Sequence, residues 1–240
     1  SGYLAFGTAN QERMRLDSSG NLGLGVTPSA WGGVLTKSFE LQNGVSIASN
    51  NATYAGYISS NAYFNGSNWI YKGSTSAAQY SIEGVNGAHI WYNAPSGTAG
   101  NAIAFTQAMT LDANGNLGIG TVSPGYRLDL LSTAPAQLRL QNTDAGSYAS
   151  MLFTGTGRSF SMGVGNASEA GIQVANQFYI YDNTAGQTRL RLDSSGNLGL
   201  GVTPSAWAGG AKALEIGTGA SFVGFTSNAV LASNCYYSGS

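Results

Sequence analysis

The chain of 240 residues contains little charge. Asp, Glu, Lys and Arg supply 9% of its residues, against about a quarter in an ordinary globular protein, and the net charge is −1. The sequence therefore has neither the basic field that attracts nucleic acid nor a polybasic strip for a membrane surface. We expect no nucleic-acid partner and no membrane insertion.

Long apolar runs, cysteine and histidine are also scarce. No run of 18 apolar residues is present, so no membrane-spanning helix is predicted. The single cysteine, Cys235, cannot form an internal disulfide, and we expect it to be a packed small side chain. The single histidine, His89, has no second histidine or reactive cysteine near it in sequence, so a catalytic triad has no support. We expect no enzymatic activity and no cofactor.

Glycine and aromatic residues are abundant. Glycine occupies 35 positions, and 13 Tyr, 9 Phe and 4 Trp contribute to a hydrophobic content of 42%. Disordered chains are poor in aromatic residues and rich in charge, so this chain is expected to fold. No window sustains the apolar spacing of an amphipathic helix, and helix is expected to be minor.

Short segments of period two predict β-strands with one buried face. Polar and apolar residues alternate in several segments, and other short runs are aromatic or β-branched between Gly, Asn or Ser. The alternating segments are 13–17, 39–42, 138–141 and 189–193, and the aromatic ones are 69–71, 90–92 and 177–181.

An internal repeat dominates the chain. Residues 15–31, RLDSSGNLGLGVTPSAW, recur letter for letter at 191–207, and a diverged copy, MTLDANGNLGIGTVSPGYRLDL, occupies 109–130. Such self-similarity predicts an array of one structural unit. The predicted segments are 1–31 (the end of a preceding unit), 32–124 and 125–204 (two units that each end in a motif) and 205–240 (the truncated start of the next).

Each motif predicts a tight turn followed by a glycine-containing strand. The Asp side chain closes an Asx turn, Gly and Asn tolerate positive φ, and glycine inside a strand marks the close approach of another backbone. Proline then ends the pairing. The predicted structural positions are Asp17, Gly20, Asn21, Gly23 and Gly25; Asp112, Gly115, Asn116, Gly118 and Gly120; and Asp193, Gly196, Asn197, Gly199 and Gly201.

Thin units of short strands have little interior of their own. Ordering one backbone residue costs about 1–2 kcal/mol, so we expect three chains to intertwine, with Leu and Ile of each repeat at the centre and Asn, Ser and Thr outside. A single-chain β-solenoid is the competing fold, although no coil period of about 20–25 residues is present.

Other chemistry is weakly supported. Calcium is an alternative at the Asp-Ser-Ser-Gly-Asn turns, but each turn offers one carboxylate, so no metal is expected. The Gly-Asn-Leu-Gly run lacks the Lys-Ser/Thr of a phosphate loop. Aromatic side chains beside amides suit sugar rings, although packing in the core is the favoured interpretation. The glycan-binding candidates are Tyr63, Trp69, Tyr71, Trp91 and Tyr92.

The three motifs together resemble the repeat of phage tail fibre and tail spike proteins. Residues 12–31, 109–124 and 188–204 carry the resemblance: a strand ending in Leu-Asp, a Ser/Asn-Gly-Asn turn, a Gly-Leu/Ile-Gly segment and a proline. The resemblance implies an elongated all-β fibre of short strands and glycine-rich turns, an intertwined homotrimer of the triple-stranded β-helix or β-prism type.

The resemblance also implies a function. It predicts a structural shaft segment in the virion that is extracellular when assembled, with two further copies of itself, other virion tail proteins and a host-surface polysaccharide or glycan as partners. Two alternatives stay open: a trimeric polysaccharide-degrading tail spike, and a cellular adhesin built from similar repeats.

Overall fold

The computed structural model describes residues 2–35, 37–42, 44–133, 138–207, 210–225 and 229–233. These residues form 21 short β-strands and no helix, which confirms the predicted all-β class. In the described part of the chain there is consequently no helix that could span a membrane. Cys235 lies outside the described residues, as do the other residues from 234 to 240 in the predicted last segment.

The chain divides into two compact units, unit 1 (residues 1–138) and unit 2 (residues 139–240). The repeat boundaries at 31, 124 and 204 are derived from the sequence repeat, not from compact units, and they stay a prediction.

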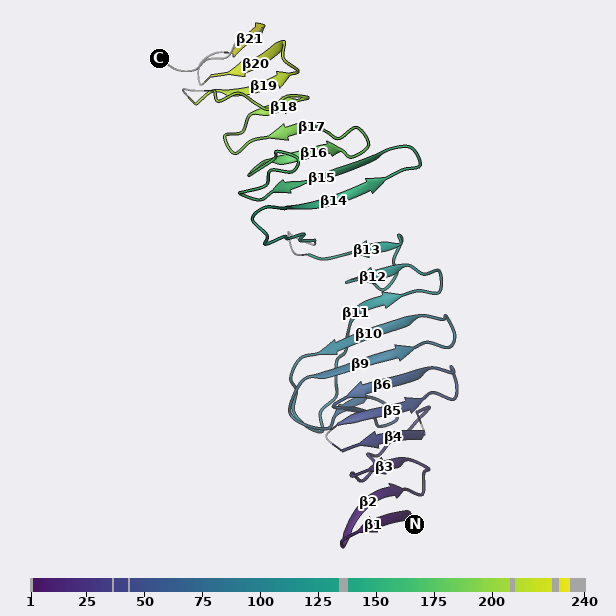
Figure 1. Cartoon of the computed structure of the whole chain (residues 1–240). Helices are drawn as coiled ribbons and strands as arrows, with labels where there is room; N and C mark the ends of the chain where they lie inside the picture. The colour runs from purple at the N-terminus through teal and green to yellow at the C-terminus, as the bar shows by residue number, and fades with distance from the viewer. Residues whose placement is uncertain are drawn as a thin grey trace. The chain divides into compact units, whose positions relative to one another are not determined.

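Unit 1 contains an 11-stranded sheet whose strands are paired almost in chain order, with a two-stranded hairpin, β7–β8, inserted between β6 and β9 (Figure 1). The strands are β1 Leu4–Thr8, β2 Gln11–Leu16, β3 Leu22–Leu24, β4 Lys37–Leu41, β5 Val45–Ser49, β6 Gly56–Ser60, β7 Ala62–Phe64, β8 Trp69–Tyr71, β9 Ala77–Ile82, β10 His89–Ala94, β11 Thr106–Leu111, β12 Leu117–Ile119 and β13 Leu128–Leu130.

Unit 2 contains an eight-stranded sheet in chain order, β14 to β21. The strands are β14 Tyr148–Thr154, β15 Ser159–Gly165, β16 Phe178–Asp182, β17 Gln187–Leu192, β18 Leu198–Leu200, β19 Lys212–Ile216, β20 Ala220–Gly224 and β21 Ala229–Ser233.

The strand pairs are antiparallel except at three places, where a three-residue motif strand pairs in parallel with the next strand. These pairs are β3–β4, β12–β13 and β18–β19. The chain runs through the proline segment between the two strands, which lets the second strand start in the same direction as the first.

Most predicted strands are present, and one is wrong. Six predicted segments lie in or overlap strands: 13–17, 39–42, 69–71, 90–92, 177–181 and 189–193. Residues 138–141 form no strand, and Leu138 and Leu140 are exposed. Alternation alone does not make a strand there, because a ladder requires a partner backbone and no described segment pairs with these residues.

The buried core of unit 1 lies on one face of its sheet, beneath the β7–β8 hairpin. Trp31, Leu35 and Ala48 are buried there, with Trp69 packed against them. This same sheet face also buries polar side chains, including Ser46, Ser59, Ser81 and Thr110. The expectation that Ser and Thr face outward is therefore wrong for these strands, since the chain's own loops cover them.

Candidate functional site

The repeated motif folds into a joint whose turn makes the same hydrogen bonds in all three copies. In the first copy, Oδ1 of Asp17 accepts from the backbone N–H groups of Ser19 (2.9 Å) and Asn21 (2.8 Å), and Oδ2 accepts from the Asn21 amide (3.0 Å). Both carboxylate oxygens are thus used within the turn. Asp112 and Asp193 make the equivalent bonds.

The asparagine of the turn connects it to the strand beyond the proline. Asn21 is 1% exposed, and its Oδ1 accepts from the backbone N–H of Ser38 at 3.0 Å. Asn197 accepts in the same way from Ala213 at 3.1 Å. A buried amide that is satisfied across two segments fixes their spacing.

The three glycines of each motif are required for different reasons. The first and third adopt positive φ, 83° at Gly20 and 70° at Gly25, which side chains rarely allow. The second does not, but a Cβ on Gly23 would lie 2.0 Å from the Val26 carbonyl oxygen. The close approach involves the chain's own backbone, so it needs no second copy. The corresponding residues are Gly115, Gly118 and Gly120, and Gly196, Gly199 and Gly201.

A carboxylate on the parallel strand completes the joint, and sequence reasoning did not single it out. Glu40 lies directly opposite Gly23 and accepts from Ser29, the residue after the proline, through its backbone N–H (2.7 Å) and its hydroxyl (3.0 Å). Trp31 also donates to Glu40 through Nε1. Glu215 repeats this arrangement with Ser205 and Trp207, and Asp129 accepts from Gly125. The sequence signal for this carboxylate is an acidic residue between two apolar residues in the strand that follows each proline.

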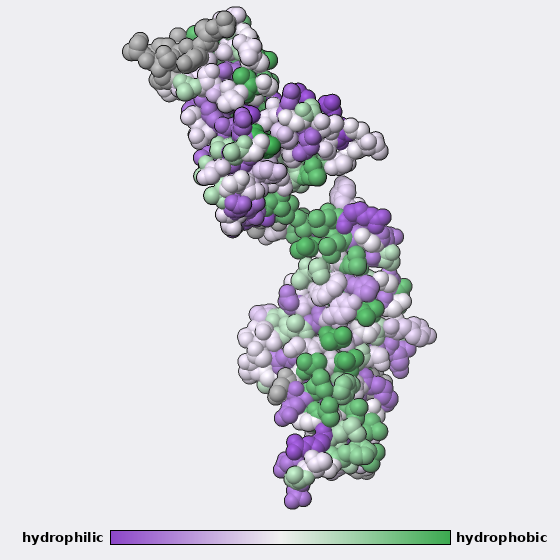
Figure 2. Space-filling view, viewed as in Figure 1, coloured by the Kyte–Doolittle hydropathy of each residue, from purple (hydrophilic) through white to green (hydrophobic). Residues whose placement is uncertain are grey.

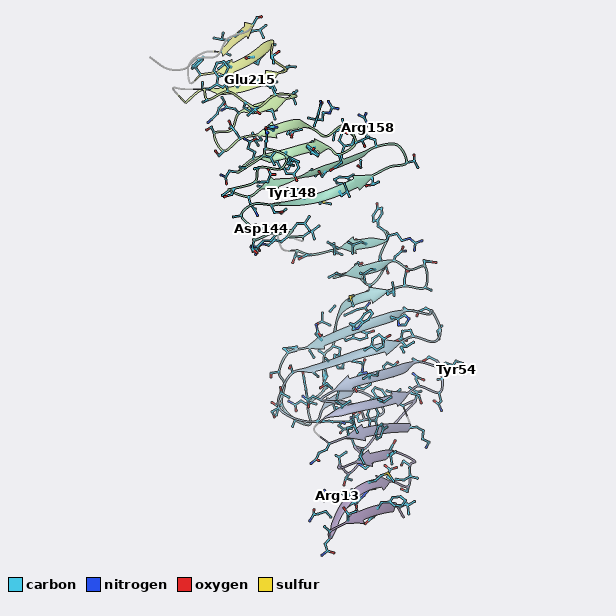
Figure 3. All side chains as sticks on the ribbon, in the orientation of Figure 1. Arg13, Tyr54, Asp144, Tyr148, Arg158 and Glu215 are labelled. Carbon is cyan, nitrogen blue, oxygen red and sulfur yellow. The ribbon has the colours of Figure 1, made fainter. Side chains whose placement is uncertain are left out.

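A β-bulge precedes each joint and was also missed. In the hairpin β1–β2 the register shifts between Phe6 and Gly7, so Arg13 on β2 (labelled in Figure 3) has no opposite residue. The Arg13 carbonyl accepts instead from the Gly25 N–H at 2.8 Å. Ala108 and Arg189 occupy equivalent bulges and bond to Gly120 and Gly201. The even alternation of Arg13 to Leu16 conceals the extra residue.

The other face of the unit 1 sheet carries an unbroken row of large side chains, the apolar ladder. One residue from each of the 11 strands lies directly opposite the next, and none of the side chains is buried. Ile47 and Ile58 are each 47% exposed. The members are Leu4, Leu16, Leu22, Phe39, Ile47, Ile58, Tyr80, Trp91, Met109, Ile119 and Leu130.

Unit 2 has a ladder of the same kind. Its eight members run from β14 to β21, and none of them is buried either. They are Ala149, Val164, Phe178, Leu192, Leu198, Leu214, Phe222 and Leu231. Green hydrophobic patches along both units are visible in Figure 2.

The accessible surface exceeds what a folded chain of this size normally presents. The accessible surface is 14252 Å², whereas two compact bodies of half the mass would expose about 12,000 Å². A contiguous apolar row of this length marks an interaction surface rather than scattered surface residues. The ladders are the candidate assembly surface.

The five aromatic glycan-binding candidates are divided between the two faces. Trp91 belongs to the apolar ladder and packs on Tyr80, while Tyr92 packs on Phe105 on the other face. Trp69 is surrounded by the rings of Trp31, Tyr57, Phe64 and Phe105. Tyr63 and Tyr71 line a hollow near the β7–β8 hairpin. Their binding of glycans stays a prediction.

His89 lies on β10, and its Nδ1 is 2.5 Å from the Tyr80 hydroxyl. Among the described residues, no three His, Cys, Asp or Glu side chains gather where a metal ion could bind.

Several carboxylates have a lowered pKa, and this predicts acid sensitivity. Hydrogen bonds from Arg189 and the Ala185 N–H lower the pKa of Asp182, whose Oδ2 also lies 3.1 Å from Arg158 Nη1. Burial raises the pKa of Asp17, but N–H donors from Asn21, Ser19 and Gly20 outweigh it and the pKa is lowered.

We therefore expect the melting temperature to be constant above the ordinary carboxyl pKa of about 4 and to fall as the pH decreases below it. A folded-state pKa below the unfolded value means that the stabilisation is present above pH 4 and is lost on acidification. Thermal melts between pH 7 and pH 2 measure this. Asp182→Asn should flatten the acid slope, and an unchanged slope in this variant would contradict the assignment.

No protein-family model and no curated protein matches the chain.

Proposed function

We propose that the chain is a structural segment of a bacteriophage tail fibre, a trimeric shaft that also takes part in recognising host-surface glycans. The resemblance of the three motifs supports the phage assignment. The observation that carries the structural role is the apolar ladder, which gives each sheet a continuous row of apolar side chains that the rest of the described chain does not bury.

Two further copies of the chain are the partners that fit this face. Five of the 11 ladder side chains are 41% to 56% exposed and the other six are partly exposed, so the row offers on the order of 600 Å², most of the ~800 Å² per partner of a stable interface. A second copy presents a row of the same length and the same strand spacing. Matching a row of this length is a condition that an unrelated globular partner rarely meets.

Three copies suit the narrow sheets better than two. The motif strands contain three residues, so the sheet is only about 10 Å wide at each joint. Three narrow faces close around an axis and cover one another's rows, whereas two leave the margins open to water. In this arrangement the polar loops lie outside, where other virion proteins and the host surface are met.

The mass in solution tests this proposal. We expect light scattering behind a sizing column to give three times 24.6 kDa, about 74 kDa, at both high and low protein concentration. A 24.6 kDa species at both concentrations would refute assembly through the ladders, and a stable dimer would refute the three-sided arrangement.

A further inference from the structure

A hollow of about 830 Å³ lies in unit 1 where the segment around β7–β8 meets the covered face of the sheet. Glu40 and Lys72 are its only charged lining residues among those described, and Tyr63, Tyr71, Thr75 and Ser76 also line it. Thr75 and Ser76 are exposed and Tyr71 is 6% exposed, so the hollow has a polar rim and an aromatic wall.

An ion pair lies in the wall of the hollow. Lys72 Nζ is 2.5 Å from Glu40 Oε2 and 2.5 Å from Ser46 Oγ, and the Glu40 side chain is 1% exposed. The two Glu40 oxygens already accept from Ser29 and Trp31. The carboxylate is therefore saturated, while the ammonium has used two of its three N–H donors on these partners.

Glu40 has neutral donors apart from Lys72. Ser29 and Trp31 donate to its two oxygens, as Ser205 and Trp207 donate to those of Glu215. A buried ion pair is costly to desolvate, and Lys72 adds to the wall of the hollow a charged donor group rather than a hydrogen bond that Glu40 otherwise lacks.

The rim of the hollow is held rigidly by one side chain. Asn61, at a positive φ of 59°, donates its amide to the carbonyls of Gly73, Thr75 and Ser76 and accepts from the Gly73 N–H at 2.6 Å. A rim fixed in this way lowers the ordering cost of binding.

We propose that this hollow binds a neutral oligosaccharide. Lys72 would donate its remaining N–H to a sugar oxygen, the Thr75 and Ser76 hydroxyls would exchange hydrogen bonds with sugar hydroxyls, and Tyr63 would offer its ring to a sugar face. Because Glu40 cancels the charge of Lys72, the hollow has no excess positive charge to favour an acidic polymer. This inference rests on the proposed function, since it places its glycan recognition at one site.

A printed array of neutral and acidic oligosaccharides tests the inference with the intact chain and two matched variants. Ser76→Trp fills the hollow from its rim, whereas Ser67→Trp places the same side chain on the exposed β7–β8 turn, outside the lining. We expect the wild type and Ser67→Trp to bind neutral spots and Ser76→Trp to lose the signal by at least about tenfold.

Lys72→Met provides a second variant that should fold, because Ser29 and Trp31 still donate to both Glu40 oxygens. We expect it to lose binding as well. Equal binding by all four proteins, binding to acidic spots alone, or no binding to any spot would overturn the inference. The mass of each variant is measured in parallel, so that a failed glycan site with an intact 74 kDa trimer is distinguished from a failure to assemble.

Discussion

Aspartate in place of Ile58 is expected to leave the chain monomeric. Ile58 lies in the middle of the apolar ladder, between Ile47 and Tyr80, and the rest of the described chain leaves it 47% exposed. In the proposed trimer three carboxylates would approach one axis in an apolar environment, where each unpaired charge costs several kcal/mol. A loss of about 4 kcal/mol raises the dissociation constant about a thousandfold.

Tyr54→Asp is the matched control for this substitution. Tyr54 lies in the turn between β5 and β6, is 86% exposed and is not part of the ladder (Figure 3). The control carries the same charge four residues away and should keep the trimeric mass. Light scattering with dilution reads out both variants, and a trimer of the Ile58 variant that survives dilution would contradict the role of the ladder.

Alanine in place of Gly199 is expected to destabilise unit 2 by about 3 kcal/mol or more. The added Cβ would lie 2.2 Å from the Val202 carbonyl oxygen and 3.0 Å from Pro204 Cδ. The clashing Val202 oxygen is a backbone atom, and hydrogen bonds of the joint fix the segment on both sides of it, so rotation of a side chain cannot relieve the clash. The parallel pairing of β18 with β19 should weaken first.

Gly219→Ala serves as the control, because a Cβ there meets nothing within 4 Å and the residue has no positive φ. Its free energy of unfolding should change by less than about 1 kcal/mol. Urea unfolding followed by circular dichroism measures both variants. Equal midpoints would show that the motif glycine is not required for close packing.

The sequence predicted local structure well because local structure has local causes. The alternation in residues 189–193 and the turn from Asp17 to Asn21 each depend on neighbours within a few positions, and both the strand and the turn are present. The parallel partner of β3 starts about a dozen residues away, beyond a segment with no period, so the alternation at 39–42 predicts that strand but not its pairing with β3. The strand predicted at residues 138–141 failed for the related reason that pairing needs a partner.

The joint was only partly predictable. Its turn and glycines follow from residue chemistry, but the part played by Glu40 depends on its place opposite Gly23, which exists only after the parallel pair forms. The hollow depends on the same assembly, because Lys72 reaches Glu40 from 32 positions further along the chain. Of the five aromatic candidates, only Tyr63 and Tyr71 line it, and sequence alone could not separate them from Trp69.

The identical joints make the length of the chain adjustable by genetic exchange. Residues 15–31 and 191–207 have the same letters, so a deletion or duplication that joins one copy to the other changes the length by 176 residues and leaves the motif itself unaltered. Leu16 lies opposite Leu22 in the first copy, as Leu192 lies opposite Leu198 in the last. A shortened or lengthened chain therefore keeps two apolar ladder residues opposite each other where the copies are joined. Chains of different length can thus arise in a single event, and natural variants should differ in length by whole repeats.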